Sequence, residues 1–306
     1  GKNSVFVGFK TAKNNDIYLS DVSVTDDVYE TENMFGGVKM TIIEPEKNQT
    51  EGFMLVTENK KIIMIDGGDQ YDKDNVVKLI RQYKNEVDDW YISHYHCDHV
   101  FALIRILEEE DIFIKNLYYD FNVTDEILEK YGDEDNYLVA RMKKAVGENR
   151  SKIGNVITPE KGNEFTTDGV KVKILNNATF RAMANMPNDS SIVFKVETPG
   201  KNILFLGDLG AYGDVLLKDE YFYNEIQDCE VVQLGHHGQS GVSDKFYQSL
   251  PAMKVAIYCA PEWLFDCNSG KGVGSGSWLT LRTREIMRVL KIRKTCSLKY
   301  GRAELG

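Results

Sequence analysis

Hydrophobic and polar residues follow one another along this 306-residue chain in short runs that predict alternating strands and helices. The apolar, β-branched runs predict strands over 38–44, 52–57, 60–65, 87–92, 170–175, 191–198, 202–206, 230–234 and 255–259, with a final strand pair around 297–304. Helical spacing of apolar residues predicts helices over 73–83, 100–107, 244–250 and 278–292, and a charged helical stretch over 124–147. This order indicates an α/β protein that opens with antiparallel strands and continues with β-α-β units.

Residues 1–35 differ from the rest of the chain because they are polar and show little periodicity. We interpret them as an N-terminal arm with one short strand over 5–9, and residues 36–306 as one compact domain. Hydrophobic residues make up 42% of the chain, which is enough for a large core. The longest apolar runs, such as residues 62–65, are too short to span a bilayer, so we expect no transmembrane segment.

The charge balance bears on the partners that the chain can bind. It has 37 basic and 47 acidic residues, for a net charge of −10. Such a chain repels polyanions at long range, so we expect no strong nucleic-acid footprint and a small-molecule or confined anionic substrate. The oligomeric state is left open.

Localisation has two opposing indications. The chain begins with Gly1 rather than Met and has a polar arm, which fits an exported domain whose signal was removed. The five cysteines include no C-x-x-C pair and fit a reducing cytoplasm instead. An exported or cell-surface location is slightly favoured over a cytoplasmic one.

All five histidines of the chain fall in two short clusters. The clusters are Ser93-His94-Tyr95-His96-Cys97-Asp98-His99 and Gly235-His236-His237-Gly238. Neutral imidazole is the commonest nitrogen ligand of zinc and similar ions, and alternate residues of an extended segment point the same way. His94 and His96 can therefore share one ion, while Asp98 and His99 face a second.

Two carboxylates stand where apolar strands stop. Asp66 follows Ile-Ile-Met-Ile, and Asp208 follows Ile-Leu-Phe-Leu-Gly. An acid beside glycine at the end of a buried strand is held at the rim of a sheet, where the backbone can turn sharply. Both acids are therefore candidates for the same site as the histidines.

The order of these motifs resembles the metallo-β-lactamase superfamily, over residues 38–304. The resemblance implies a four-layer αββα sandwich of two mixed β-sheets flanked by helices. It implies that His94 and His96 bind a first metal and that Asp98 and His99 bind a second. It also implies that Asp208 bridges the two ions, that the pair His236 and His237 supplies the last ligand of the second site, with His236 favoured, and that Asp66 is a structural acid that orients the ligand loop.

One departure from this pattern is that no histidine lies between His99 and His236, so the intermediate ligand of the first site is missing. Asn188-Asp189-Ser190-Ser191 stands in its place. This feature and the Leu-Gly-His-His-Gly run resemble the branch typified by the C-terminal domain of the competence protein ComEC, in which the first metal has fewer protein ligands. Asp189 and Ser190 are candidates for positioning substrate or water.

The resemblance implies a metal-dependent hydrolase in which ions activate a hydroxide, with Asp98 and Asp208 in catalytic roles. One or two divalent transition-metal ions are expected, zinc first and manganese or iron as alternatives. Phosphodiester or phosphoester hydrolysis is ranked first, because phosphoryl oxygens suit a two-metal clamp. Hydrolysis of a lactam, lactone or thioester is an alternative, and so is a non-catalytic metal-binding module.

Overall fold

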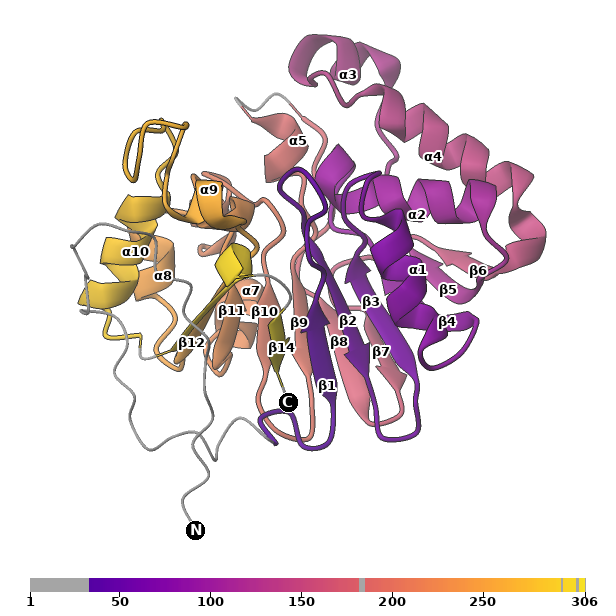
Figure 1. Ribbon diagram of the computed structural model, residues 1–306, viewed down its shortest axis with the longest axis horizontal. Coiled ribbons are helices and arrows are strands. Elements are labelled where there is room, and N and C mark those ends of the chain that lie inside the picture. The colour runs from indigo at the N-terminus through magenta and orange to yellow at the C-terminus, as the bar shows by residue number, and fades with distance from the viewer. Residues whose placement is uncertain (1–32, 182–184, 293, 301–302, 306) are drawn as a thin grey trace.

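The computed structural model describes residues 33–181, 185–292, 294–300 and 303–305. Two seven-stranded mixed sheets lie face to face, and helices cover their outer faces (Figure 1). The predicted fold class, a four-layer α/β sandwich, is therefore confirmed. The predicted strand over residues 5–9 lies outside the described residues.

The first sheet has the strand order β14-β1-β2-β3-β4-β5-β6. Its strands are β1 (Lys39–Ile42), β2 (Gly52–Val56), β3 (Ile62–Asp66), β4 (Glu86–Tyr91), β5 (Phe113–Tyr118), β6 (Ile153–Ile157) and β14 (Ala303–Leu305). The second sheet has the order β13-β12-β11-β10-β9-β8-β7. Its strands are β7 (Glu164–Thr167), β8 (Val170–Ile174), β9 (Phe194–Glu197), β10 (Ile203–Phe205), β11 (Val231–Gln233), β12 (Val255–Tyr258) and β13 (Lys294–Ser297).

Ten α-helices occur in the part of the chain that the structure describes. They are α1 (Lys73–Arg81), α2 (Cys97–Glu109), α3 (Asp125–Tyr131), α4 (Tyr137–Glu148), α5 (Met186–Asp189), α6 (Gly213–Leu216), α7 (Glu220–Glu225), α8 (Asp244–Gln248), α9 (Glu262–Phe265) and α10 (Thr280–Val289). Figure 1 shows α1, α2 and α4 on the outer side of the first sheet, with α8 and α10 at the opposite side of the molecule. None of the described helices combines the length and apolarity that a membrane span needs.

The two sheets share one connection pattern. Antiparallel pairs join β1, β2 and β3, and parallel pairs then join β3 to β6. In the second sheet antiparallel pairs join β7 to β10, and parallel pairs join β10 to β13. The strands β3 and β10 are therefore equivalent, as are β4 and β11. The carboxyl ends of these four strands deliver the acids and histidines discussed below.

Apolar side chains form three layers, one between the sheets and one beneath each set of helices. Between the sheets, the rings of Phe53 and Phe205 lie 4.7 Å apart, centroid to centroid, in an edge-on arrangement. Every residue of β2 and β3 is buried, as expected for strands covered on both faces. Met34 and Phe35 also pack between the sheets, just before the predicted domain start.

Several predicted elements differ from the observed ones. The helical stretch over 124–147 divides into α3 and α4, because Gly132 ends α3 in an extended conformation. The final two strands do not pair with each other: β13 pairs with β12, whereas β14 pairs with β1 in the other sheet. The strands β6 and β7 were missed because they are partly exposed and mix polar with apolar residues. The strand β5 was missed as well.

The helix α2 begins at Cys97 rather than at Val100. This places Asp98 and His99 in its first turn, directly after the extended residues that carry His94 and His96. Because α2 starts directly after the loop that follows β4, both residues lie at the end of the sandwich where the strands terminate.

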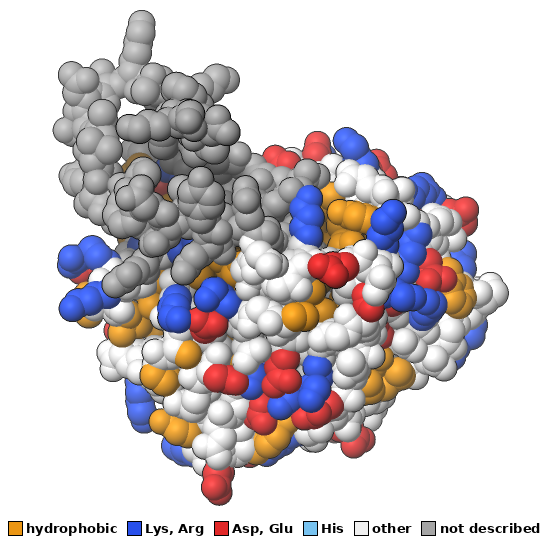
Figure 2. Space-filling view, turned by 90° about the horizontal axis from the view of Figure 1, so that it is seen from below, with side chains coloured by type: hydrophobic (Ala, Val, Ile, Leu, Met, Phe, Trp, Pro, Cys, Tyr) orange, Lys and Arg blue, Asp and Glu red, His pale blue; other side chains and the backbone are white. Residues whose placement is uncertain are grey.

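Figure 2 views the molecule from below Figure 1. On the described part of that face, acidic and basic side chains are interspersed.

Candidate metal centre

The five histidines and the acids Asp66, Asp98 and Asp208 converge at the carboxyl ends of four strands. His94 and His96 follow β4, and Asp98 and His99 stand in the first turn of α2. Asp66 is the last residue of β3, Asp208 follows β10, and the 3-10 turn His236–Gly238 follows β11. All predicted metal-site residues are therefore brought together at one end of the sandwich.

Three histidines have one ring nitrogen engaged and the other free. Their Nδ1 atoms have protein partners, while their Nε2 atoms are buried and have no hydrogen bond of acceptable geometry. The Nδ1 partners are Ser93 Oγ at 3.0 Å for His94, Asp66 Oδ2 at 2.9 Å for His99 and the carbonyl oxygen of Cys259 at 3.0 Å for His237. Partners of this kind fix the ring orientation of metal-binding histidines.

The other two histidines are also held at one nitrogen. His96 Nε2 lies 2.7 Å from Asp133 Oδ2, which leaves Nδ1 as the nitrogen available to a metal. His236 Nδ1 lies 2.9 Å from Ser240 Oγ, and its Nε2 lies 3.6 Å from Asp208 Oδ2. Each of the five imidazoles thus keeps one nitrogen for the centre.

Asp208 lies between two groups of possible ligands. Its Oδ1 is 3.1 Å from His99 Nε2, and its Oδ2 is 4.0 Å from His94 Nε2. One group consists of His94, His96 and Asp208, and the other of Glu51, His99, Asp208 and His237, with the ligand atoms of each group within 4.8 Å of one another. A carboxylate shared by two such groups has the placement to contact two neighbouring ions.

Orphaned polar atoms show that the centre fits a divalent cation. Both carboxylate oxygens of Asp208, one oxygen of Glu51 and the Nε2 atoms of His94, His99 and His237 are buried without a hydrogen bond. Burying unpaired acceptors costs free energy, and native proteins satisfy nearly all of them. Imidazole and carboxylate are the usual ligands of zinc, manganese and iron, so the donor set suits such ions.

The charges of the centre reinforce this conclusion. Burial raises the pKa of Asp208, but His237 and His99 outweigh burial and hold that pKa well below its usual range. Burial lowers the pKa of His99 and of His237, yet neighbouring carboxylates, Asp208 first, raise both well above the usual value. The pKa of His94 is lowered by burial and by the adjacent histidines. Positive charge near the carboxylates is therefore favourable. A bound divalent ion would supply it and would displace protons from His99 and His237.

His236 and His237 have unusual backbone conformations. Their φ angles are 53° and 56°, and Gly238 follows at 79°. Non-glycine residues rarely adopt positive φ, and such strain is concentrated at functional sites. The two successive left-handed residues direct both imidazoles towards Asp208.

The structure separates the two histidines that the sequence could not distinguish. His237 belongs to the second group, and its Nε2 lies 3.0 Å from Asp98 Oδ2, whereas His236 is outside that group. The sequence favours His236 as the second-site ligand, and the geometry favours His237 instead. The reason is the left-handed turn, which places the buried ring of His237 beside Asp98.

The segment that replaces the missing histidine includes α5 and lies against the Asp208 loop. Asp189 Oδ1 accepts hydrogen bonds from the backbone N–H groups of Gly210 (3.0 Å) and Tyr212 (3.1 Å). The Ser190 hydroxyl donates to the carbonyl of Pro187 (2.7 Å). Ser191 Oγ accepts from the backbone N–H of Asp208 (3.1 Å). The segment thus holds the Asp208 loop in place, and the positioning of substrate or water by Asp189 and Ser190 stays a prediction.

Four residues of the centre were missed at the sequence level. They are Gln49, Glu51, Ser93 and Asp133, which contact the predicted ligands from other loops. Gln49 Nε2 donates to Asp98 Oδ2 at 2.7 Å. The Ser93 N–H donates to Asp66 Oδ1 at 2.7 Å. Ser93 is adjacent to the histidine motif in the sequence. The other three residues belong to no sequence motif, because their contacts with the ligands form between distant parts of the chain.

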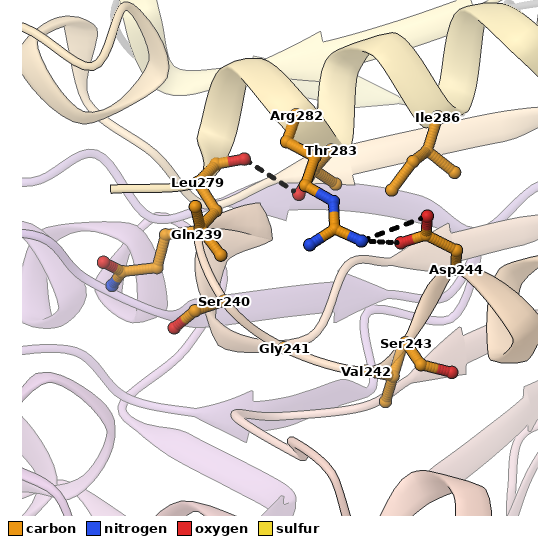
Figure 3. Close-up of a pocket in the computed structure, with 10 residues that line it drawn as sticks. All are labelled: Gln239, Ser240, Gly241, Val242, Ser243, Asp244, Leu279, Arg282, Thr283 and Ile286. Carbon is orange, nitrogen blue, oxygen red and sulfur yellow. Dashed lines mark hydrogen bonds and ion pairs between the residues drawn. The ribbon is translucent and has the colours of Figure 1, made fainter. Parts of the chain in front are cut away.

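A pocket adjoins the His236 side of the centre (Figure 3). Its volume is about 390 Å³, and it lies between the loop after His237 and the helix α10. Its lining residues are Gln239, Ser240, Gly241, Val242, Ser243, Asp244, Leu279, Arg282, Thr283 and Ile286. Two of them connect the pocket to the centre by hydrogen bonds. Ser240 Oγ bonds His236 Nδ1, and Gln239 Nε2 donates at 3.2 Å to Oε1 of Gln49, which itself bonds Asp98.

Arg282 and Asp244 are the charged residues of the pocket lining, and they form an ion pair. Arg282 Nη2 lies 3.1 Å and 3.2 Å from the two carboxylate oxygens of Asp244, and Figure 3 shows the guanidinium group inside the pocket. The Arg282 side chain is 63% exposed, so water and small ligands can reach it. The pocket therefore combines an apolar wall with one accessible cation, within the size range of small-molecule sites, roughly 300–1,000 Å³.

Comparisons with known proteins identify the fold and a family. The family described as Anti-Pycsar protein Apyc1 matches residues 36–242. The metallo-β-lactamase fold protein YhfI from Bacillus subtilis is similar over 87% of this chain and 99% of its own, with 11% identity and a TM-score of 0.53. The Zn²⁺-bound PqqB from Methylobacterium extorquens aligns over 64% of this chain and 72% of its own, with 12% identity and a TM-score of 0.41.

No curated protein matches the chain significantly. At identities this low the similarity to YhfI demonstrates the fold alone, and the metallo-β-lactamase fold implied by the motifs is confirmed. The narrower resemblance to the ComEC branch stays a prediction.

Proposed function

Because this chain belongs to the Anti-Pycsar protein Apyc1 family, we propose that it is a metal-dependent phosphodiesterase whose substrate is a small cyclic nucleotide. The observation that carries the proposal is Asp208, which is shared by two groups of unpaired, buried ligand atoms. Such a pair of sites suits phosphoryl transfer, in which attacking and leaving oxygens both need stabilisation.

The residues divide between the two ions as follows. His94, His96 and Asp208 would hold the first. His236, whose Nε2 lies 3.6 Å from Asp208 Oδ2 and whose side chain is outside the second group, would stand in for the missing intermediate histidine. Asp98, His99, Asp208 and His237 hold the second. Bound divalent ions supply Lewis acidity and lower the pKa of water towards neutrality.

The protein contributes orientation and charge. Asp66 holds His99 through Nδ1, and Asp133 holds His96 through Nε2, so each ring presents its other nitrogen to the centre. Burial raises the pKa of Asp98, but His99 and His237 hold it well below its usual range, which keeps this carboxylate charged. A charged carboxylate can bind a cation, and Asp98 lies beside His237, so we assign Asp98 to metal binding.

The pocket next to His236 is suited to the nucleoside part of the substrate. Val242 and Ile286 offer apolar surface to a base, and Arg282 offers a positive charge to a phosphate or a carbonyl oxygen. A substrate that fits such a pocket is small, and the net charge of −10 disfavours a long polyanion. A cyclic nucleotide with one phosphodiester meets both conditions.

Hydrolysis assays test the proposal. The metal-reconstituted protein is offered cyclic nucleotides, bis-p-nitrophenyl phosphate, single-stranded DNA, a phosphocholine ester, nitrocefin and a homoserine lactone. We expect turnover of cyclic nucleotides and of the model diester, and none after chelation. Turnover of only the lactam or lactone would overturn the phosphodiesterase assignment, and no turnover by a fully metallated protein would favour a binding module.

A further inference from the structure

We propose that Glu51 is an additional ligand of the second ion and that it adapts this site to a harder, higher-coordinate ion such as Mn²⁺ rather than to tetrahedral zinc. The inference rests on the metal-dependent function proposed above. No motif marks Glu51, which lies in the loop between β1 and β2.

The position of Glu51 is tightly determined. The residue is 1% exposed, and its backbone N–H donates to the carbonyl oxygen of Asp98 at 2.9 Å. Its Oε2 accepts a hydrogen bond from Gln233 Nε2 at 2.8 Å. The loop that carries Glu51 is thereby attached to the ligand loop of the first sheet and to β11 of the second.

The other carboxylate oxygen of Glu51 is the one available to an ion. Oε1 is buried and has no hydrogen-bond partner. A ligand atom of Glu51 lies within 4.8 Å of those of His99, Asp208 and His237. A buried carboxylate with one unpaired oxygen, this close to three other potential ligands, has the placement of a ligand itself.

A purely structural role does not explain this carboxylate. A glutamine in its place would still accept the hydrogen bond from Gln233, and it would bury no negative charge. Instead the protein buries Glu51 in the centre that also holds Asp98 and Asp208. Like charges brought together out of water are costly unless a cation compensates them. A divalent ion bound beside these three carboxylates would compensate that cost.

The number of ligands then indicates the type of ion. Asp98, His99, Asp208 and His237 would already fill a tetrahedral zinc site. A fifth protein ligand requires five or six positions, and an added carboxylate makes the site richer in oxygen. Carboxylate-rich, higher-coordinate sites suit manganese, whereas zinc prefers four ligands.

Metal titration of Glu51→Gln tests the proposal, with Asp89→Asn as the control. Asp89 is a carboxylate of β4 that is 2% exposed, and it accepts hydrogen bonds from Asn116 and Tyr118, away from the centre. Each protein is stripped with chelator, and Mn²⁺ and Zn²⁺ binding is measured by equilibrium dialysis with elemental analysis. Melting temperatures are recorded with and without Mn²⁺.

We expect Glu51→Gln to keep the melting temperature of the metal-free protein and to lose at least about tenfold in Mn²⁺ affinity at one of two sites, with a smaller loss for Zn²⁺. The shift in melting temperature caused by Mn²⁺ should shrink accordingly. Asp89→Asn should lower the metal-free melting temperature and leave Mn²⁺ binding unchanged.

Wild-type Mn²⁺ affinity in Glu51→Gln would overturn the proposal, even if the protein hydrolyses cyclic nucleotides. A different pair of results is weaker Mn²⁺ binding by the variant and no hydrolysis of any cyclic nucleotide by the wild-type protein. That pair of results would support Glu51 as a ligand and overturn the proposed function. If the variant fails to fold, anomalous diffraction from wild-type crystals grown with Mn²⁺ decides. An oxygen of Glu51 within about 2.5 Å of an ion supports the proposal, and a separation above about 3.5 Å contradicts it.

Discussion

The Nε2 atoms of His236 and His237, adjacent in the chain, both lie 3.6 Å from the same oxygen of Asp208. Neighbouring side chains of a regular strand point to opposite faces, so this convergence requires the left-handed backbone at both residues. Their environments nevertheless differ. His237 is fully buried and contacts Asp98, whereas the His236 side chain is 18% exposed and contacts Ser240 at the pocket.

The first prediction separates these two histidines. His237→Ala should weaken the second site, and His236→Ala should weaken only the first, because each site keeps its other ligands. Metal titration by equilibrium dialysis with elemental analysis should find the weakened affinity at a different one of the two sites in each variant. Equal effects of both substitutions on the same site would contradict the division of ligands.

The second prediction concerns the shared carboxylate. Asp208→Ala should lower kcat for phosphodiester hydrolysis at least about 100-fold, because both ions lose a ligand, and His96→Ala should have a similar effect. Steady-state assays with bis-p-nitrophenyl phosphate measure this loss. Asp111→Ala is the control, since the Asp111 side chain is 79% exposed and pairs with Arg81 away from the centre. Wild-type rates in Asp208→Ala would exclude a two-metal mechanism.

The third prediction tests the pocket as the nucleoside site. Arg282→Ala should raise KM for the cyclic nucleotide about three- to tenfold and change kcat little, because an exposed charge contributes modest binding energy. Arg288→Ala is a matched control on the same helix: the two arginine side chains are 63% and 65% exposed, and Arg288 pairs with Glu285. If the two variants have the same KM, the substrate does not contact Arg282.

The fourth prediction concerns stability and pH. Burial raises the pKa of Asp88, but Lys115, Lys84 and the backbone N–H of Ile62 outweigh burial and hold it below the usual value of 3.8. A depressed pKa means that the native state favours the charged form. The stabilisation is therefore present above the usual pKa and is lost as the pH falls towards the folded-state pKa.

Asp88→Asn should therefore lower the free energy of unfolding by about 2 kcal/mol at pH 7, and the difference from wild type should shrink below about pH 4. Urea unfolding of the metal-free proteins at several pH values measures this difference. A difference that is constant down to pH 2 would show that the ion pairs of Asp88 do not stabilise the fold.

The sequence by itself determined the layer architecture and most of the metal centre. Apolar strands that end at Asp66 and just before Asp208 are local features, and so is the spacing of His94, His96, Asp98 and His99. Such residues lie at the rim of any sheet that buries those strands, because they directly follow the strand ends. The motif order was therefore sufficient to predict a sandwich and the meeting of these side chains at one end of it, and the two metal sites stay a prediction.

Only the tertiary structure decided which groups complete the centre. Glu51 and Gln233 are 182 residues apart, and their hydrogen bond joins the two sheets. The placement of His237 beside Asp98 depends on two left-handed residues, and the partly exposed strands β6 and β7 have no clear apolar pattern. These features arise when distant segments pack together and bury polar atoms that must then find partners, a requirement that no local spacing along the chain can express.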